Sequence, residues 1–335
     1  MAFEKKAPIQ RPQDEYIIEY PQALAYADMQ QHIIWPHTEY PVEDDIQSVL
    51  VSNTESETYA VTYGLRLFTK YELFAGSCYW NGRVTRMYPK PCIRTMAATF
   101  GMVEMQSHAR FYNKLNEALH LDTPEFLNSY KEDPVLVERM KFLEDIMSGD
   151  NDLASVAVFS MVEGAILYST FAFFKHFRHG GKSKYKNLVS GISASARDEN
   201  IHAEGGAWLY RTHRDELELS EEELRGLEAV IIEAAKQIEE HESAIIDNMF
   251  VKGSIEGITP KKLKNFVQSR LNLCLKNLGI PNQWKVGYNP IADWFYDDLN
   301  AVTLHDFFDT SGSQYNRNWA QDRFEWPEHL KEGEW

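Results

Sequence analysis

The residues whose types and spacing suggest chemistry are glutamates that stand three positions before a histidine. Two such pairs occur, Glu199–His202 in SARDENIHAEG and Glu117–His120 in NEALHLD. On a helix this spacing puts both side chains on one face, where they can bind one metal ion. The second pair lies in the last turn before Asp122-Thr123-Pro124, where an exposed helix end is the simpler interpretation. The first pair is therefore the candidate metal-binding pair.

Three further glutamates lie among apolar residues, where an ionised carboxylate needs a partner. They are Glu72 in LFTKYELFAG, Glu104 in FGMVEMQSHARFY, and Glu163 within an apolar run. A single buried glutamate usually pairs with an arginine, but three on separate helices indicate metal binding. A di-metal carboxylate bundle uses two lone glutamates and two Glu/His pairs, all projecting inward. The sequence supplies them in alternating order as Glu72, the Glu104/His108 pair, Glu163 and the Glu199/His202 pair. These carboxylate and imidazole ligands suit iron or manganese.

Helices are needed to position these residues, and the apolar periodicity predicts an all-α chain. We expect helices over the segments 43–60, 61–87, 92–121, 124–130, 133–148, 151–178, 184–214, 220–250 and 259–278. Several of their boundaries carry recognisable signals: Pro91 follows a break, Pro124 follows a capping Thr123, and Ser220 begins a capping box with Glu223. No repeat or linker divides the chain, which indicates one helical domain.

The apolar run from Leu153 to Phe174 is long enough to cross a bilayer. However, Glu163 lies at its centre, where an ionised carboxylate is expensive in lipid. A helix that is apolar on all sides is otherwise a core helix of a large helical domain. We therefore expect a buried helix and no membrane association.

Composition excludes several functional classes. The chain has 34 basic and 50 acidic residues in 335, a net charge of −16, which disfavours binding to nucleic acid. Its three cysteines are far apart in sequence, so a disulfide framework and a cysteine zinc site are both disfavoured. The first residues contain no apolar segment typical of a secretory signal. These features predict a cytoplasmic protein.

Taken together in order and spacing, the motifs resemble the small, radical-generating subunit of class I ribonucleotide reductases. The resemblance runs from about Trp35 to the C-terminus. It rests on the segments LFTKYE, HARFY, MVEGAILYSTFAFF, ARDENIH, NPIADWFYDDLN and HDFFDTSGSQY. It implies a ferritin-like di-metal carboxylate bundle with extra helices, and an enzyme that reduces ribonucleotides to deoxyribonucleotides together with a large catalytic subunit.

The resemblance also implies roles for individual residues. The metal ligands would be Glu72, Glu104, His108, Glu163, Glu199 and His202. Two iron ions are expected, with manganese or a mixed manganese–iron pair as alternatives. In the family, oxygen reacts with the reduced metal pair, and the resulting oxidant takes one electron from a tyrosine that matches Tyr112. Trp35 and Asp198 match a relay between the metal site and the large subunit.

Each of these residues also has a purely structural interpretation. Tyr112 by itself is typical of a core tyrosine, Trp35 of an apolar plug, and Asp198 of a charge on a helix surface. His241 lies among three glutamates in EEHES, and this segment is interpreted as a solvated helix face outside the site.

The first Glu/His pair departs from the family pattern. Met105 occupies the position three residues before His108, and the nearest carboxylate, Glu104, stands four residues before it. Both spacings leave the side chain within about 60° of the histidine on an ideal helix. Glu104 can therefore be a ligand without distortion or with a single π-bulge, which we favour. The alternative is that Met105 replaces a carboxylate and leaves a weakened or metal-free site.

The chain is predicted to have three parts: an extended N-terminal arm over 1–34, a helical domain over 35–310, and a flexible tail over 311–335. The resemblance implies that the tail docks on the large subunit and that the protein is a homodimer. No tyrosine follows Tyr315, so the aromatic residue that relays the radical from the tail stays open.

Two rival functions use similar residues. A related di-metal oxidase would act on an organic substrate and would need a substrate cavity near the metals. A metal-storage bundle would hold many iron atoms and form no tyrosyl radical. The polar, aromatic tail favours the reductase.

Overall fold

The computed structural model describes residues 6–46, 51–179 and 182–296, and in these ranges the chain forms helices and no strand. The α-helices are α1 (Pro21–His32), α3 (Glu55–Leu65), α4 (Phe68–Leu73), α5 (Thr85–Met87), α6 (Pro91–Val103), α7 (Ala109–Ala118), α8 (Pro124–Asn128), α9 (Pro134–Ser148), α10 (Asp152–Met161), α11 (Tyr168–Lys175), α12 (Lys186–Leu217), α13 (Glu221–Met249) and α14 (Pro260–Leu278). The short 3-10 helices are η1 (Pro8–Gln10), η2 (Val42–Asp45), η5 (Ser129–Glu132) and η7 (His176–Arg178). The predicted all-α class is confirmed.

Three stretches of π-helix interrupt the long helices. They are η3 (Phe74–Val84), η4 (Glu104–His108) and η6 (Val162–Ile166). They join α4 to α5, α6 to α7 and α10 to α11, so each long helix continues through its π segment. Insertions of this kind are frequent at functional sites, and they change the face that a side chain occupies.

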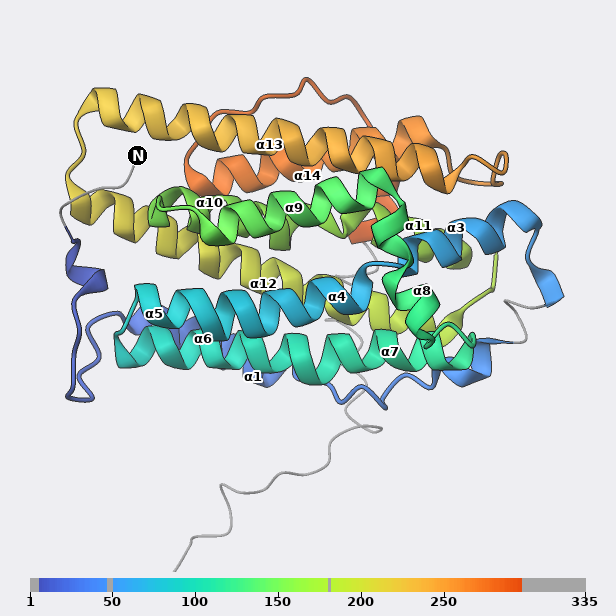
Figure 1. Cartoon of the computed structure of the whole chain (residues 1–335), viewed down its shortest axis with the longest axis horizontal. Coiled ribbons are helices and arrows are strands. Elements are labelled where there is room, and N and C mark those ends of the chain that lie inside the picture. The colour runs from blue at the N-terminus through green and yellow to red at the C-terminus, as the bar shows by residue number, and fades with distance from the viewer. Residues whose placement is uncertain (1–5, 47–50, 180–181, 297–335) are drawn as a thin grey trace, which may run out of the picture.

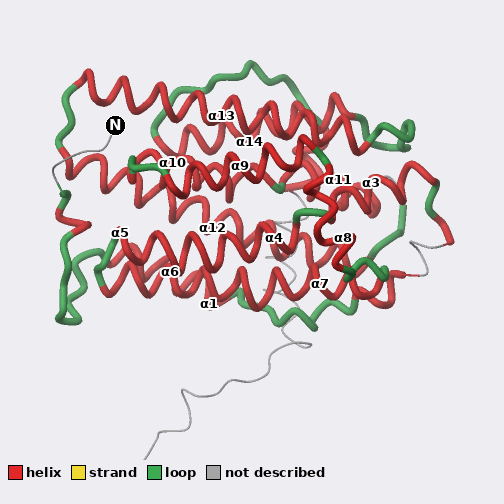
Figure 2. Tube along the Cα trace, in the orientation of Figure 1, coloured by secondary structure: helices red, strands yellow, loops and turns green. Residues whose placement is uncertain are grey.

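Four long helical rods form the centre of the bundle: α4–η3–α5, α6–η4–α7, α10–η6–α11 and α12 (Figures 1 and 2). Contacts join α4 to α7, α6 to η3, and α12 to both α10 and η6. Helices α13 and α14 pack together and against this centre, and α1 packs along α6 (Figure 1). This arrangement brings the middle of each central rod to one place inside the protein.

The helix starts follow the expected chemistry. Thr123 accepts a hydrogen bond from the Phe126 amide, with Pro124 in the first turn. Ser220 and Glu223 form a reciprocal capping box at the start of α13. Such side chains satisfy amide groups that have no partner within the helix. The boundary signals read from these residues are confirmed.

The long apolar segment is a core helix. Residues Asp152–Arg178 have the length and hydropathy of a membrane span, but 94% of the most apolar window is buried inside the protein. The neighbouring helices α12, α13 and α14 cover it. Protein therefore surrounds Glu163, as its position in the sequence indicated.

Two predictions about the first sixty residues were wrong in part. The arm is not extended throughout: α1 spans Pro21–His32 and packs on α6 and α12, because Ala23, Tyr26 and Ala27 form a buried stripe despite the polar composition. Where one helix was expected over 43–60, the described residues form a 3-10 turn at 42–45, helical residues at 46 and 51–52, and then α3 from Glu55, where Thr54 forms a capping box. The tail at 311–335 lies outside the described residues.

Candidate metal centre

The six predicted ligands come from the four central rods and meet in the core. Glu72 lies on α4, Glu104 and His108 at the two ends of η4, Glu163 in η6, and Glu199 with His202 on α12. All six side chains are buried. Two groups of four donors are formed, and within each group the donor atoms lie within 4.8 Å of one another. Residues distant in sequence are therefore assembled as two adjoining sites.

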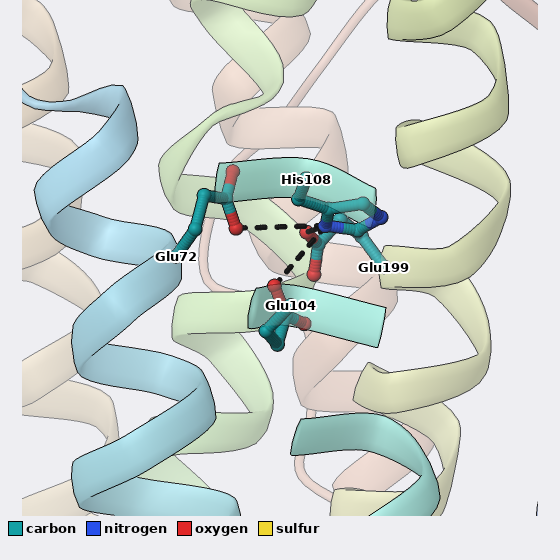
Figure 3. A group of neighbouring side chains, drawn as sticks. All are labelled: Glu72, Glu104, His108 and Glu199. Carbon is teal, nitrogen blue, oxygen red and sulfur yellow. Dashed lines mark hydrogen bonds and ion pairs between the residues drawn. The ribbon is translucent and has the colours of Figure 1, made fainter. Parts of the chain in front are cut away.

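The first group surrounds Nδ1 of His108 (Figure 3). This atom lies 3.1 Å from Glu104 Oε2, 3.3 Å from Glu199 Oε1 and 3.5 Å from Glu72 Oε2. The three carboxylates and the imidazole arrive from three different rods and point toward a common centre (Figure 3). Such a set of hard oxygen donors with one nitrogen donor suits iron or manganese.

The second group surrounds Nδ1 of His202. This atom lies 2.6 Å from Glu104 Oε1, 3.6 Å from Glu199 Oε2 and 4.0 Å from Glu163 Oε2. Glu104 and Glu199 thus present one oxygen to each histidine, so either carboxylate could be shared by two metal ions. Glu72 and Glu163 belong to one group each, as terminal ligands would.

Glu104, and not Met105, faces the centre. The π turn over Glu104–His108 separates this glutamate from its histidine by four residues, while keeping both on the inner face. Met105 lines a surface cleft of about 420 Å³ together with Leu73. Gly76 makes the close packing possible, because a Cβ there would lie 2.7 Å from Met105 Cγ and 2.9 Å from Glu104 Cβ.

The charges of the clustered carboxylates and histidines interact strongly, and bound cations would offset the negative charge. Burial, reinforced by neighbouring carboxylates, raises the pKa of Glu72 and Glu163 well above the ordinary value. Burial opposes ionisation of Glu104 too, but the adjacent histidines lower the pKa of Glu104 below its usual range. Burial also opposes a charged His202, yet Glu104 raises the pKa of His202 to about 9.

A pair of divalent ions fits this donor set. Four carboxylates and two neutral imidazoles bring two divalent cations to formal neutrality. Within the described part of the chain, Glu72 Oε1 and His202 Nε2 are buried and have no hydrogen-bond partner. Polar atoms buried in this way are costly unless something binds them. The six residues therefore suit a di-metal centre.

A hydrogen-bonded chain leads from His108 toward the N-terminal segment. His108 Nε2 lies 3.0 Å from Asp198 Oδ2, and the same oxygen accepts a bond of 2.7 Å from Trp35 Nε1. The other oxygen of Asp198 accepts from Gln30 Nε2 at 2.9 Å. The Trp35 and His108 rings also stack, with their centroids 5.8 Å apart. Asp198 is fully buried, which excludes its interpretation as a surface charge.

Sequence reasoning missed two residues, Gln30 and Trp80, whose hydrogen bonds hold Asp198 and Glu163 in place. Gln30 lies on the buried stripe of α1 with Ala23 and Ala27, and that seven-residue spacing was the signal available. Trp80 donates from Nε1 to Glu163 Oε1 at 2.8 Å, and no local pattern marks it. Such outer contacts orient metal ligands and fix the oxygen that remains free to bind.

Tyr112 is fully buried, one helical turn beyond His108. Its ring packs edge-on against Phe68 with centroids 4.7 Å apart, and its hydroxyl donates to Ser195 Oγ at 3.0 Å. Burial, followed by the charge of Glu72, raises the pKa of Tyr112 well above its ordinary value. The phenol is thus kept neutral and shielded from water.

The remaining candidates lie elsewhere. Glu117 is exposed in the last turn of α7, and neither it nor His120 joins the cluster, as expected for a helix end. The segment around His241 was interpreted as a solvated face, and for Glu242 this was wrong. Glu242 is buried and pairs with Arg139 at 2.8 Å, because α13 turns this side toward α9.

Comparison with known proteins identifies the family. A sequence profile described as "Ribonucleotide reductase, small chain" matches residues 14–290, which is most of the chain. The chain belongs to the ribonucleotide reductase small-chain family. As a reductase small chain, the protein supplies the radical for ribonucleotide reduction and works with a large catalytic subunit.

Individual relatives agree with this family. A probable ribonucleoside-diphosphate reductase small subunit of Invertebrate iridescent virus 3 is 28% identical over 329 residues, covering 92% of this chain and 85% of the relative. The dimanganese(II)-NrdF of Streptococcus sanguinis has the same fold, with a TM-score of 0.73, 17% identity, and coverage of 84% of this chain and 97% of that one. The R2 subunit from Clostridium botulinum matches with a TM-score of 0.69, 17% identity, and coverage of 84% and 88%. The ferritin-like reductase fold is confirmed.

Proposed function

We propose that Glu72, Glu104, His108, Glu163, Glu199 and His202 hold the di-metal centre of this reductase small chain and that Tyr112 carries its radical. The observation that supports this most strongly is the shared use of two carboxylates by two four-donor groups. Tyr112 is buried one turn beyond His108, with a neutral phenol. When bound, the metal pair supplies a one-electron oxidant to this phenol.

We assign Trp35 and Asp198, together with the proposed ligand His108, to the relay of the radical toward the large subunit. Trp35 donates a hydrogen bond to Asp198, which in turn contacts His108. This chain joins one ligand directly to the segment that follows α1, so it offers a bonded route out of the core. Trp35 is only 2% exposed, so the relay stays shielded from solvent on this side of the bundle.

We propose two iron ions as the cofactor, with manganese or a mixed pair as alternatives. The carboxylate and histidine donors accept both metals. Anaerobic loading with each metal, followed by activation, distinguishes them through metal content and the yield of radical. About two ions per chain are expected from the two donor groups. One ion or none would contradict the assignment of six ligands.

The radical assignment is tested with Tyr112→Phe. This variant should keep its metal content, because the hydroxyl of Tyr112 contacts Ser195 and no ligand. It should lose the tyrosyl radical signal in electron paramagnetic resonance. A radical of undiminished intensity in the variant would move the assignment to another tyrosine.

The size of the nearby cavity argues against a di-metal oxidase with an organic substrate. Among the described residues, a cavity of about 20 Å³ lies beside Glu72, Glu163 and Glu199. This volume is close to that of one water molecule, so an organic substrate does not fit. A small diatomic reactant is all that the cavity can admit without rearrangement.

We propose that the C-terminal tail, residues 311–335, binds the large subunit. These residues lie outside the described part of the chain, and the proposal rests on the family resemblance of the segment that precedes them. Truncation after Arg317 should abolish nucleotide reduction with a matching large subunit while the radical persists. Unchanged reduction would remove the tail from the interface.

We propose a cytoplasmic location for this reductase small chain, whose long apolar helix over Asp152–Arg178 is buried inside the protein.

We also propose that the protein is a homodimer. Leu73 is 49% exposed and Met102 is 37% exposed, and Met105 lies one turn beyond Met102 in the cleft that Leu73 also lines. These apolar side chains border a cleft whose other lining is mostly polar, and together they offer a surface suited to a second copy of the chain. Leu73→Glu should shift the mass measured by sedimentation toward the monomer, whereas an unchanged mass would place the interface elsewhere.

A further inference from the structure

The hydroxyl of Tyr112 has a single side-chain partner among the described hydrogen bonds, Ser195. Tyr112 Oη donates to Ser195 Oγ over 3.0 Å, and both residues are fully buried. Around this bond the surroundings are aromatic: the ring centroids of Phe68 and Phe111 lie 4.7 and 5.3 Å from that of Tyr112. A polar contact in such an apolar setting fixes the direction of the phenolic O–H.

A glycine on α12 makes room for the aromatic ring that precedes Tyr112 in the sequence. Gly191 lies one turn before Ser195 on α12, and a Cβ at Gly191 would lie 2.1 Å from Phe111 Cζ. Only glycine therefore leaves room for the Phe111 ring against α12. With that ring in place, the hydroxyl of Ser195 lies within hydrogen-bond distance of the neighbouring Tyr112.

We propose that Ser195 is a positioning residue for the radical, which it holds in a direct hydrogen bond. This rests on the assignment of the radical to Tyr112. In the reduced protein the phenol donates to Ser195 Oγ. After oxidation the phenoxyl oxygen has no proton to donate, and the serine O–H turns about its Cβ–Oγ bond to donate to it. The same pair of oxygen atoms thus stays bonded in both states.

The step balances without a chemical change at Ser195. Tyr112 gives up one electron and one proton, and the metal centre, when loaded and oxidised, would accept the electron. The proton would leave the phenol at the same time, to a basic group of the loaded metal centre. Ser195 keeps its own proton throughout, since an aliphatic hydroxyl is too weak a base to retain a second one.

The hydrogen bond is measured directly on the radical. The full-length protein is loaded with metal, activated in H₂O or D₂O, and examined by high-field paramagnetic resonance and deuterium electron–nuclear double resonance. The variants are Ser195→Ala, which removes the hydroxyl, and Ser195→Val, which also fills the space that a water could enter. Ser160→Ala is the matched control, because Ser160 is an equally buried serine that bonds to the Ala203 carbonyl on α12.

The wild type and Ser160→Ala should show an exchangeable deuteron coupled to the phenoxyl oxygen. Ser195→Val should lose this coupling and show a larger g1 value, because an oxygen without a hydrogen bond retains more orbital angular momentum. Ser195→Ala should show the same loss or a longer, weaker coupling to a water. Metal content should stay at the wild-type level in every variant.

Two outcomes would overturn the inference. One is an exchangeable coupling of wild-type strength in both Ser195 variants; the other is a wild-type radical that lacks the coupling. Tyr112→Phe, prepared in parallel, separates this failure from that of the radical assignment. Suppose that Tyr112→Phe loses the radical while the Ser195 variants give the same radical spectrum as the wild type. Tyr112 then remains the radical site, and only the role of Ser195 is rejected.

Discussion

Replacing Glu104 with alanine is the most direct test of the metal centre, because this residue belongs to both donor groups. Its two oxygens lie 3.1 Å from His108 Nδ1 and 2.6 Å from His202 Nδ1. The substitution reduces each group from four protein donors to three. We therefore expect both metal ions to bind more weakly, in contrast to the loss of Glu72, which belongs to one group only.

The expected loss of metal affinity can be bounded from the effect of contacts that only orient a ligand. Losing a partner that only orients a ligand lowers metal affinity by roughly 10- to 100-fold, so the loss of a direct donor should reach at least this range. At a metal concentration that saturates the wild type, a hundredfold loss removes about 2.7 kcal/mol of metal-linked stability per site. Thermal unfolding with and without metal should reveal this difference.

The assay is metal content per chain after anaerobic loading with iron or manganese and removal of unbound metal. The matched control is Glu117→Ala, an exposed glutamate in the last turn of the helix that follows η4. We expect about two ions per chain for the wild type and this control, and fewer than one for Glu104→Ala. Comparable losses in the two variants would refute the assignment of Glu104.

A second variant tests the register itself. Glu104→Ala combined with Met105→Glu restores the three-residue spacing to His108 that the family pattern favours. In the structure Met105 lines the surface cleft with Leu73, so the new carboxylate should face outward and fail to recover metal binding. Recovery of two ions per chain would show that the π turn rearranges and that the inward position of Glu104 is not fixed.

Three further predictions concern the relay and the stability of the fold. Trp35→Phe removes the indole N–H of the proposed relay and should keep the metal and the radical. Nucleotide reduction with the large subunit, measured as steady-state turnover, should fall by more than about tenfold. Burial lowers the pKa of His213 from 6.5 to about 4. Between these pH values the unfolded chain binds a proton at His213 that the folded chain does not bind. The free energy of unfolding should therefore be highest above about pH 6.5 and fall by about 3 kcal/mol toward pH 4. Urea unfolding of the metal-free protein should show a smaller decrease between pH 7 and 5 for His213→Asn, and an identical decrease would contradict this. Glu242→Gln leaves the buried Arg139 without its carboxylate and should destabilise the protein by about 3–5 kcal/mol, while the exposed Glu240→Gln should change the unfolding free energy little.

The candidate ligands were accessible from the sequence because each breaks a local rule. Glu163 stands in the middle of an apolar run, and Glu72 and Glu104 also interrupt apolar helices. A carboxylate in such a place requires a partner, so composition and periodicity point to it without tertiary information. The fold class and the four rods followed in the same way from helix-length periodicity and capping residues.

The predictions were wrong where the local composition gave no indication that a residue is buried. The polar appearance of the first thirty residues concealed α1, whose small buried stripe gains its stability from packing on α6. Glu242 was placed on a solvated face because EEHES is highly charged, but its carboxylate pairs with Arg139, more than a hundred residues earlier in the chain. A contact between distant segments leaves no trace in the sequence immediately around either partner.

The sequence by itself determined which residue types are available to bind metal and which helices carry them. Only the tertiary structure decided how they are shared, with Glu104 and Glu199 presented to both histidines and Met105 turned to the surface. The hydrogen bonds of Gln30, Trp80 and Ser195 to the site are likewise tertiary. The physical reason is that spacing along a helix fixes the face a side chain occupies, whereas bridging and outer contacts depend on how separate helices are rotated and how closely glycines let them approach.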